Sequence, residues 1–265
     1  MSEDQKAAGE FLLKKLQKQN ENDQLLMFLH GSPGTEKSTF IRRVKNFTNI
    51  VMRITATSGI AAMSLNGSTI DYLVDQRYVN QDNKNPFKVQ SRVTNIGKRL
   101  GRATMIVIDE ISMMSCNKFV ELDSLLRKVK KKSIPFGGLD ILLVGDFAQL
   151  SPVGGTSIMS VLVQSTLEYV TPDKDVLLAS NLASLFLKFD LNILMRSKGC
   201  TKLKELLCRY RSATRSKPSI TIDEIRDIGM LNRKTLETDP AFRDATVLVT
   251  TRRERESLTE TIGQW

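Results

Sequence analysis

The sequence predicts an α/β protein in which helices flank a mainly parallel sheet. Four short apolar runs are expected to form strands, at residues 25–29, 51–55, 105–108 and 141–144. The runs do not alternate with polar residues, which is typical of strands covered on both faces. Helical patterns lie between the runs, and this alternation favours a doubly wound sheet. In such a sheet functional residues gather where the strands end, at their carboxyl edge.

The first predicted strand leads into HGSPGTEKS, residues 30–38. Gly31, Lys37 and Ser38 match the phosphate-loop pattern G-x-x-x-x-G-K-[ST], and the alternative is a chance strand-turn-helix. In a phosphate loop, backbone N–H groups hold the phosphates, the lysine reaches the outer ones and the hydroxyl binds Mg²⁺. The residues expected to bind the nucleotide are Gly31, Ser32, Pro33, Gly34, Thr35, Glu36, Lys37, Ser38 and Thr39. An amphipathic helix should follow, with its apolar face formed by Phe40, Ile41, Val44 and Phe47.

Glu36 occupies the position where the pattern has its second glycine. Glycine there lets the backbone approach the phosphates without a Cβ, often in a conformation that other residues resist. A carboxylate about 4 Å from a phosphate oxygen would cost about 4 kcal/mol at an effective dielectric of 20. That cost is roughly a thousandfold in affinity. If the side chain turns outward to solvent, only the backbone cost remains, and we expect impaired nucleotide binding.

Acidic and amide side chains follow the third and fourth predicted strands. Asp109 and Glu110 end the strand in MIVIDEIS, where Asp109 suits a Mg²⁺ contact and Glu110 a base that orients water. Such a pair can also be a helix cap, but its partnership with the loop favours chemistry. Gln149 follows the strand at 141–144 and could sense a terminal phosphate by hydrogen bonding.

The formal net charge of +10 over 265 residues favours a polyanionic partner, and the basic residues are clustered. One cluster lies at 198–217, a second at 127–132 and a third at 252–255. A solvated helix face would explain any single cluster equally well. The three cysteines have no metal or disulfide spacing and are expected to be free thiols in an intracellular protein. No apolar run is long enough to span a membrane, and His30, the only histidine, is expected to have only a structural role.

The remainder of the chain predicts further organisation. Residues 78–86 are polar and are expected to form a loop or insertion. A basic helical segment is predicted from about residue 198, and residues 245–250 read as another strand close to the end of the chain. The predicted organisation is therefore a first domain at 1–197, a connecting segment at 198–243 and the truncated start of a second domain at 244–265.

The chain resembles the PIF-like (petite integration frequency) DNA helicases of superfamily I, and most of all those carried by Helitron-type transposons. The resemblance is carried by the loop, TATSGIAAMSLNGSTI, VIDEISMM, PFGGLDILLVGDFAQLSPV and LNILMR, which occur in that family's order. It implies a RecA-like P-loop NTPase domain and an ATP- and Mg²⁺-dependent motor that unwinds DNA from a single-stranded tail, 5′ to 3′. It also implies single-stranded DNA and its junctions with duplex as partners, a monomer, and roles in DNA repair, recombination and telomere maintenance. The nucleus is the first expected location and the mitochondrion the second.

The resemblance assigns roles to single residues. Gln5 is similar to the glutamine that reads the adenine edge, and Gly34, Lys37 and Ser38 resemble the triphosphate and Mg²⁺ ligands. Asp109 resembles the metal-binding acid, Glu110 the catalytic base and Gln149 the γ-phosphate sensor. Arg196 is similar to the arginine that stabilises the transferred phosphoryl group. The segments that resemble single-strand contacts contribute Thr57, Ser58, Gly59, Ser68 and Thr69.

The chain also departs from the family pattern. Besides Glu36, Asp71 stands where a histidine usually lies beside the DNA strand, and an acid there would repel phosphate. Ser151 and Ser197 replace a proline and a glutamine, and the motifs of the second motor domain are absent. An alternative is therefore a non-catalytic DNA-binding remnant that has lost ATP turnover. A third reading, an unrelated P-loop NTPase or kinase, is disfavoured by PFGG and GDFAQL.

Overall fold

The computed structural model describes residues 2–17, 24–75, 86–146, 148–163 and 173–195. The chain divides into two compact units, Met1–Thr201 and Lys202–Trp265, and these ranges all belong to the first. In the second unit only Glu205, Arg209, Arg253, Glu254 and Glu256 are described. Arg196, nearly all of the predicted loop at 78–86 and the predicted strand at 245–250 therefore lie outside the described residues. The predicted domain boundaries stay predictions.

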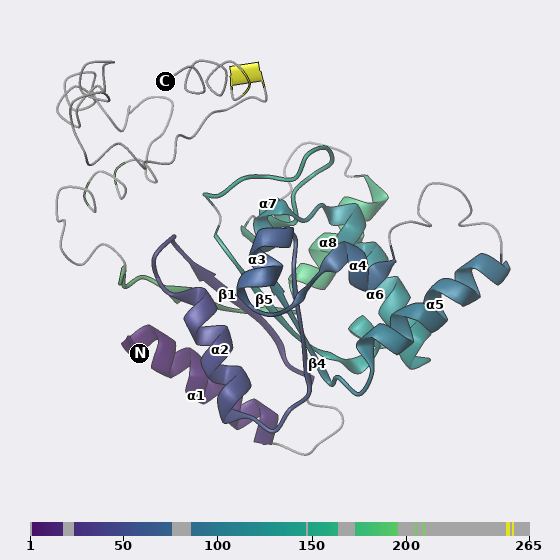
Figure 1. Cartoon of the computed structure of the whole chain (residues 1–265), viewed down its shortest axis with the longest axis horizontal. Helices are drawn as coiled ribbons and strands as arrows, with labels where there is room; N and C mark the ends of the chain where they lie inside the picture. The colour runs from purple at the N-terminus through teal and green to yellow at the C-terminus, as the bar shows by residue number, and fades with distance from the viewer. Residues whose placement is uncertain are drawn as a thin grey trace. The chain divides into compact units, whose positions relative to one another are not determined.

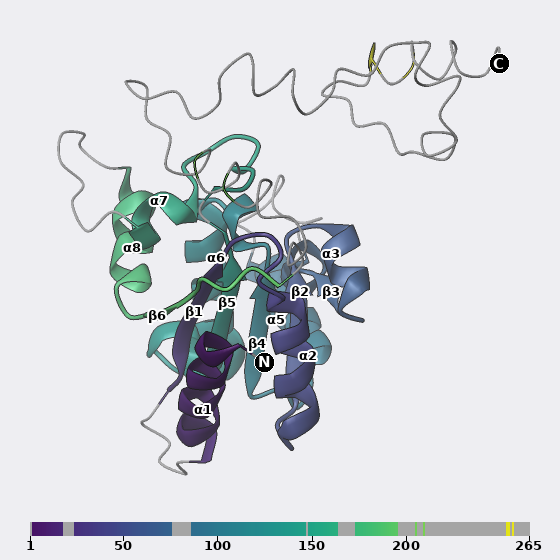
Figure 2. The same cartoon turned by 90° about the vertical axis from the view of Figure 1, so that its left-hand side faces the viewer.

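The described part of the first unit is built on one parallel sheet of six strands with helices around it (Figure 1). The strand order is β3-β2-β4-β5-β1-β6 (Figure 2). The four predicted strands are confirmed as β1 (Leu26–Gly31), β2 (Met52–Ala56), β4 (Met105–Asp109) and β5 (Asp140–Gly145). Two further strands, β3 (Ser68–Thr69) and β6 (Leu187–Leu191), extend the sheet at its edges. The predicted RecA-like α/β architecture is present.

Helices α1 (Glu3–Gln17) and α2 (Lys37–Phe47) cover one face of the sheet and lie side by side in both views (Figure 2). Ala8 and Leu12 of α1 share a core cluster with Phe40, Ile41 and Val44 of α2. The predicted apolar face of α2 is thus confirmed for three of its four residues. The prediction for Phe47 is wrong, because this last residue of the helix is 77% exposed beyond the edge of the core.

The other face is covered by α4 (Ile70–Val74), α5 (Pro86–Leu100), α6 (Cys116–Lys130), α7 (Ile158–Val163) and α8 (Lys174–Ala183). On α6, Phe119, Leu122 and Leu126 are fully buried against this face. Cys116, at the start of α6, is a buried free thiol, as predicted. Among the described residues no helix is both long and apolar enough to cross a bilayer.

Three short helices complete the part of this unit that the structure describes: α3 (Gly59–Ser64), η2 (Ile111–Met113) and η3 (Pro135–Gly138). The PFGG sequence forms η3, where Phe136 and Gly137 both have left-handed backbones, with φ of 50° and 64°. A Cβ on Gly137 would lie 2.6 Å from the carbonyl oxygen of Leu126, so only glycine fits. The PFGG motif is therefore a tight turn that packs against α6 and starts β5.

Candidate functional site

The carboxyl ends of β1, β4 and β5 bring the sequence-predicted residues to one edge of the sheet. A cavity of about 880 Å³ is lined there by residues of all three strand ends. They include Ser38 from the loop after β1, Asp109 and Glu110 from β4, and Gln149 from the turn after β5. This volume is in the range of sites that enclose small-molecule ligands. Residues far apart in the sequence are thus assembled as predicted.

The loop between β1 and α2 is tightly folded. Gly34 has a φ of 86°, and the backbone N–H and hydroxyl of Thr35 both donate to the carbonyl oxygen of Ser32, at 3.3 and 2.9 Å. A Cβ on Gly31 would lie 2.6 Å from Thr35 Oγ1 and 3.0 Å from Leu191 Cβ. Glycine at position 31 is therefore required by close packing.

Glu36 begins α2 with a left-handed backbone, at φ 59° and ψ 40°. This conformation costs a non-glycine residue roughly 1–2 kcal/mol. The side chain is exposed and makes no capping hydrogen bond, so the first-turn N–H groups of α2 are not capped by a side chain. Uncapped N–H groups at a helix start suit an anion. In this structure, therefore, the backbone cost of Glu36 is present while its carboxylate points to solvent.

Lys37 is held inside the loop and is only 8% exposed. Its Nζ donates to the carbonyl oxygen of Gly31 at 2.7 Å and to that of Ser32 at 3.2 Å. The ammonium is also close enough to Asp109 to lower the pKa of that carboxyl group. The lysine thus connects the loop electrostatically with the end of β4.

Asp109 is 3% exposed, and its Oδ1 accepts the backbone N–H of Glu110 at 3.0 Å. Burial, and next the charge of Glu110, raise the pKa of Asp109 to about 6, although the Glu110 N–H and Lys37 act in the opposite direction. Glu110 has a left-handed φ of 56° and its side chain makes no capping hydrogen bond to η2. The alternative of a helix cap is therefore wrong for Glu110, and its strained backbone is typical of functional sites.

The donor set fits a magnesium ion only if a ligand completes it. No group of three or more His, Cys, Asp or Glu side chains that could hold a metal ion occurs among the described residues. Ser38 and Asp109 contribute one hydroxyl and one carboxylate to the same cavity. Magnesium is commonly held by one or two carboxylates together with substrate phosphates and water. The site therefore suits a magnesium–nucleotide complex better than a metal ion alone.

Gln149 lies on a turn that starts at Asp146. The Asp146 side chain is fully buried, and its Oδ1 accepts the N–H of Ala148 at 3.1 Å. The N–H of Gln149 contacts the Asp146 carbonyl oxygen at 3.3 Å. The position of the Gln149 side chain in the cavity thus depends on how Asp146 is held.

Gln5 of α1 packs against the phosphate loop and is 1% exposed. Its Nε2 donates to the carbonyl oxygen of Thr35 at 2.8 Å, whereas its buried Oε1 has no hydrogen-bond partner. A buried acceptor without a partner is costly, and an amino group such as that of adenine would satisfy it. The geometry is consistent with the predicted role of Gln5.

The residues predicted to contact single-stranded DNA lie between the end of β2 and the end of β3, around the start of α3 and in β3 itself. Ser58 and Thr69 cap α3 and α4 by accepting the N–H groups of Ala61 and Tyr72. Gly59 starts α3, and the Ser68 hydroxyl is buried without a hydrogen-bond partner. The Thr57 hydroxyl donates to the backbone oxygen of Glu110 at 2.7 Å. This last bond connects the predicted DNA segment to the predicted catalytic base.

Asp71, the departure expected to repel phosphate, is paired with a cation. Its carboxylate forms a salt bridge with Lys118 of α6, and the two side chains are 43% and 22% exposed. The negative charge at this position is therefore compensated locally. Sequence reasoning missed Lys118, because its position on α6 gives no local signal that it would lie beside Asp71.

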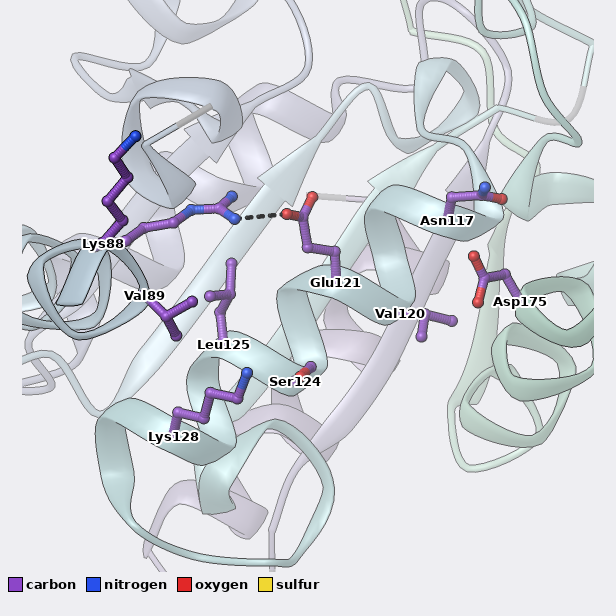
Figure 3. A pocket seen from close by; sticks show the side chains of 10 residues that line it. Lys88, Val89, Asn117, Val120, Glu121, Ser124, Leu125, Lys128 and Asp175 are labelled. Atoms are coloured by element: carbon purple, nitrogen blue, oxygen red, sulfur yellow. Dashed lines mark hydrogen bonds and ion pairs between the residues drawn. The ribbon is translucent and has the colours of Figure 1, made fainter. Parts of the chain in front are cut away.

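The basic cluster at 127–132 lies at the opposite edge of the sheet. It lies at the end of α6 and just beyond it. The next element, η3, accepts a hydrogen bond at the carbonyl oxygen of Pro135 from the side chain of Gln24, two residues before β1. A separate cavity of about 370 Å³ lies beside this helix, lined by Lys88, Asn117, Lys128 and Asp175 among others (Figure 3). The dashed line there is the 2.7 Å pair between Arg92 and Glu121. None of the sequence-predicted site residues lines this second cavity, and a solvated helix face is the simpler reading of the cluster.

Comparison with known proteins identifies a family. The profile of the PIF1-like helicases matches residues 1–173. The ATP-dependent DNA helicase PIF5 of Trypanosoma brucei brucei is 31% identical over 131 residues, which are 48% of this chain and 14% of that protein. The crystal structure of Pif1 helicase from Candida albicans superimposes with a TM-score of 0.69 at 20% identity, over 98% of this chain and 53% of that one.

A further structural relative is Pif1 helicase from Bacteroides, solved in complex with ADP-AlF3 and single-stranded DNA. It matches with a TM-score of 0.63 at 19% identity, over 96% of this chain and 56% of that one. These likenesses show the fold. The chain spans between 14% and 56% of the lengths of the three relatives.

Proposed function

Because the chain belongs to the PIF1-like helicase family, we propose that it is the ATP-binding part of a motor that unwinds DNA 5′ to 3′ from a single-stranded tail. The observation that carries the proposal is one cavity at the carboxyl edge of the sheet. Ser38, Asp109 and Glu110 line it together with Gln149. These are the hydroxyl, acid, base and amide that ATP hydrolysis requires.

ATP binding is proposed to use the loop and the two helices beside it. The N–H groups at the start of α2 and in the loop would bind the phosphates, with Lys37 at the outer ones. The unpartnered Oε1 of Gln5 would accept the adenine amino group. Ser38 and Asp109 would hold Mg²⁺, which supplies neutralisation of phosphate charge when bound.

Hydrolysis is proposed to depend on residues around the γ-phosphate position. Glu110 would orient the attacking water and accept its proton. Gln149 would hydrogen-bond to the γ-phosphate, so that the turn after β5 changes its contacts once the phosphate leaves. Arg196 would add a positive charge in the transition state.

Single-stranded DNA is proposed to lie along the segment formed by Thr57, Ser58, Gly59, Ser68 and Thr69. The Bacteroides Pif1 relative was solved with single-stranded DNA, which supports single-stranded DNA as the ligand. The Thr57–Glu110 hydrogen bond would relate DNA contact to hydrolysis. Junctions of duplex with single-stranded DNA as substrates, a monomeric state and a nuclear location stay proposals of the same kind.

A second candidate function is a DNA-binding remnant without ATP turnover. It is favoured by Glu36, whose left-handed backbone and added carboxylate stand at the phosphate loop. The two candidates share the fold and the DNA surface and differ only in catalysis.

The two candidates are separated by ATP hydrolysis assays on the full chain, with and without a single-stranded oligonucleotide. The motor predicts turnover that DNA stimulates several-fold and that Glu110→Gln abolishes. Salt-sensitive DNA binding without hydrolysis would support the remnant. A chain that neither binds DNA nor hydrolyses ATP contradicts both.

A further inference from the structure

His30, the only histidine of the chain, lies at the junction of three strands. It is the penultimate residue of β1, and its register partners are Gly145 on β5 and Asp190 on β6. Its Nδ1 lies 2.7 Å from Asp190 Oδ1, and its Nε2 lies 3.7 Å from Asp146 Oδ1. The imidazole thus stands between two carboxylates that belong to the strands on either side of it.

The chemistry of the two carboxylates defines what His30 does. An ionised carboxylate only accepts hydrogen bonds, so Nδ1 must donate to Asp190. Asp190 also pairs with Lys188 at 3.3 Å, and its side chain is 44% exposed. The Asp146 side chain is fully buried, and a buried carboxylate requires donors or positive charge around it. His30 faces Asp146 from β1 with Nε2 at 3.7 Å, beyond hydrogen-bond distance, so the ring compensates this carboxylate only as a charge pair, with both ring nitrogens protonated.

The three strands lead to two parts of the proposed site, the phosphate loop and the Gln149 turn. The phosphate loop starts one residue after His30, and the turn from Asp146 leads to Gln149. Beyond β6, the N–H of Met195 donates to the carbonyl oxygen of Gly34 in the phosphate loop at 2.8 Å. His30 thus lies where the chain enters the phosphate loop and beside the residue from which the Gln149 turn starts.

We propose that His30 is a positioning residue that fixes Asp146, and through it the Gln149 turn, relative to the phosphate loop. This inference rests on the proposed function, in which Gln149 contacts the γ-phosphate. The proposed role goes beyond stabilising the fold. Gln149 would contact only the γ-phosphate, so loss of the contact between His30 and Asp146 should weaken the binding of a triphosphate and not that of a diphosphate.

Two substitutions of His30 each replace one ring nitrogen and so test the two carboxylate contacts separately. In His30→Asn the side-chain amide replaces the Nδ1 donor toward Asp190, whereas in His30→Gln the longer side chain places an amide near the Nε2 position, toward Asp146. His30→Leu removes both contacts. If the apolar variant does not fold, the comparison of the two polar variants still decides.

The first measurement is calorimetric binding of magnesium ADP and of magnesium ADP with aluminium fluoride to each full-length variant. The His30→Asn and His30→Leu variants should bind ADP within about twofold of the original chain and the fluoride complex roughly tenfold more weakly. The His30→Gln variant should bind the fluoride complex as tightly as the original chain does. Equal loss for both ligands, or no loss in any variant, overturns the inference.

The second measurement is amide hydrogen exchange without nucleotide. Exchange at residues 145–150 should rise roughly tenfold in the His30→Asn and His30→Leu variants and stay unchanged in His30→Gln, while exchange in α6 stays constant in all three. Unchanged exchange in His30→Leu, or a rise confined to β6, contradicts the inference. An original chain that binds neither nucleotide complex contradicts the proposed function instead, while hydrogen exchange still decides the role of His30.

Discussion

The Nζ atom of Lys37 donates a 2.7 Å hydrogen bond to the carbonyl oxygen of Gly31, six residues before it. The ammonium group is therefore held against the start of the phosphate loop by neutral carbonyl acceptors. An ammonium has three donors, so a phosphate oxygen can be bound without the loss of every loop contact. Lys37 is thus oriented by the protein before any phosphate is bound, which limits the rearrangement that binding requires.

Replacement of Lys37 by methionine keeps the apolar stem and removes the charge. We expect ATP turnover to fall by roughly 100- to 1000-fold, the usual effect of removing one donor to a charged transition state. Steady-state phosphate release measures it. Lys45→Met, on the exposed side of the same helix, is the matched control and should leave turnover unchanged. Turnover retained in Lys37→Met would rule out the proposed nucleotide site.

Glu36→Gly should stabilise the chain and strengthen nucleotide binding. Relief of the left-handed backbone is worth roughly 0.5–1 kcal/mol after the added freedom of the unfolded glycine is subtracted. Urea denaturation measures the stability and calorimetry with magnesium ATP measures the affinity.

The matched control is Lys131→Gly, since Lys131 ends α6 with a similar left-handed backbone, at φ 52°, far along the chain from the loop. It should gain comparable stability and no affinity. If Glu36→Gly behaves in the same way as Lys131→Gly, the carboxylate of Glu36 does not disturb nucleotide binding.

Strands β1, β4 and β5 could be predicted from sequence because they are buried on both faces and therefore consist largely of consecutive apolar residues. β6 could not, since LKFDL is mostly exposed at the edge of the sheet and carries two charges. Phe47 fits the helical period of α2 but lies past the end of the core, where periodicity carries no information. Local pattern thus predicts the interior of the fold better than its limits.

The candidate site shows the same division. Lys37, Asp109 and Gln149 were predicted because each lies in a short motif directly after a buried strand. The partner of His30 lies 160 residues away on the strand that sequence reasoning missed, and so its pairing with Asp190 was not predicted. The salt bridge of Asp71 with Lys118 was missed because it depends on how α6 packs beside α4. Contacts between residues far apart in the sequence depend on the chain topology and can be identified only from the structure.

Asp109→Asn should make the folded chain more stable at pH 8 than the original. The pKa of Asp109 is raised from 3.8 to about 6 in the folded chain. At a pH where this carboxyl group is ionised, its burial therefore lowers the free energy of unfolding. Between these two values the folded state binds the proton more tightly than the unfolded state, so stability falls as the pH rises through 6. A shift of about two pKa units corresponds to up to about 3 kcal/mol.

Urea denaturation in the presence of a chelator at pH 4, 6 and 8 tests this expectation. The advantage of the asparagine variant should be greatest at pH 8 and much smaller at pH 4, where the folded carboxyl is protonated and the unfolded one, with a pKa of 3.8, is about half ionised. Glu10→Gln, which removes an exposed carboxylate from α1, is the control and should show no such trend. An asparagine variant that is less stable than the original at pH 8 would contradict the proposed cause.

Asp71→Asn should strengthen the binding of single-stranded DNA, because Lys118 then keeps its charge while the acid opposite it is gone. At low salt we expect a gain of roughly two- to fivefold, which decreases as salt screens the charges. One added phosphate contact should steepen the salt dependence of the binding constant by about 0.7 on logarithmic axes. Fluorescence anisotropy with a labelled oligonucleotide at several salt concentrations measures both quantities. The double variant Asp71→Asn with Lys118→Met should lose the gain, and a gain that persists in it would show that Lys118 does not contact DNA.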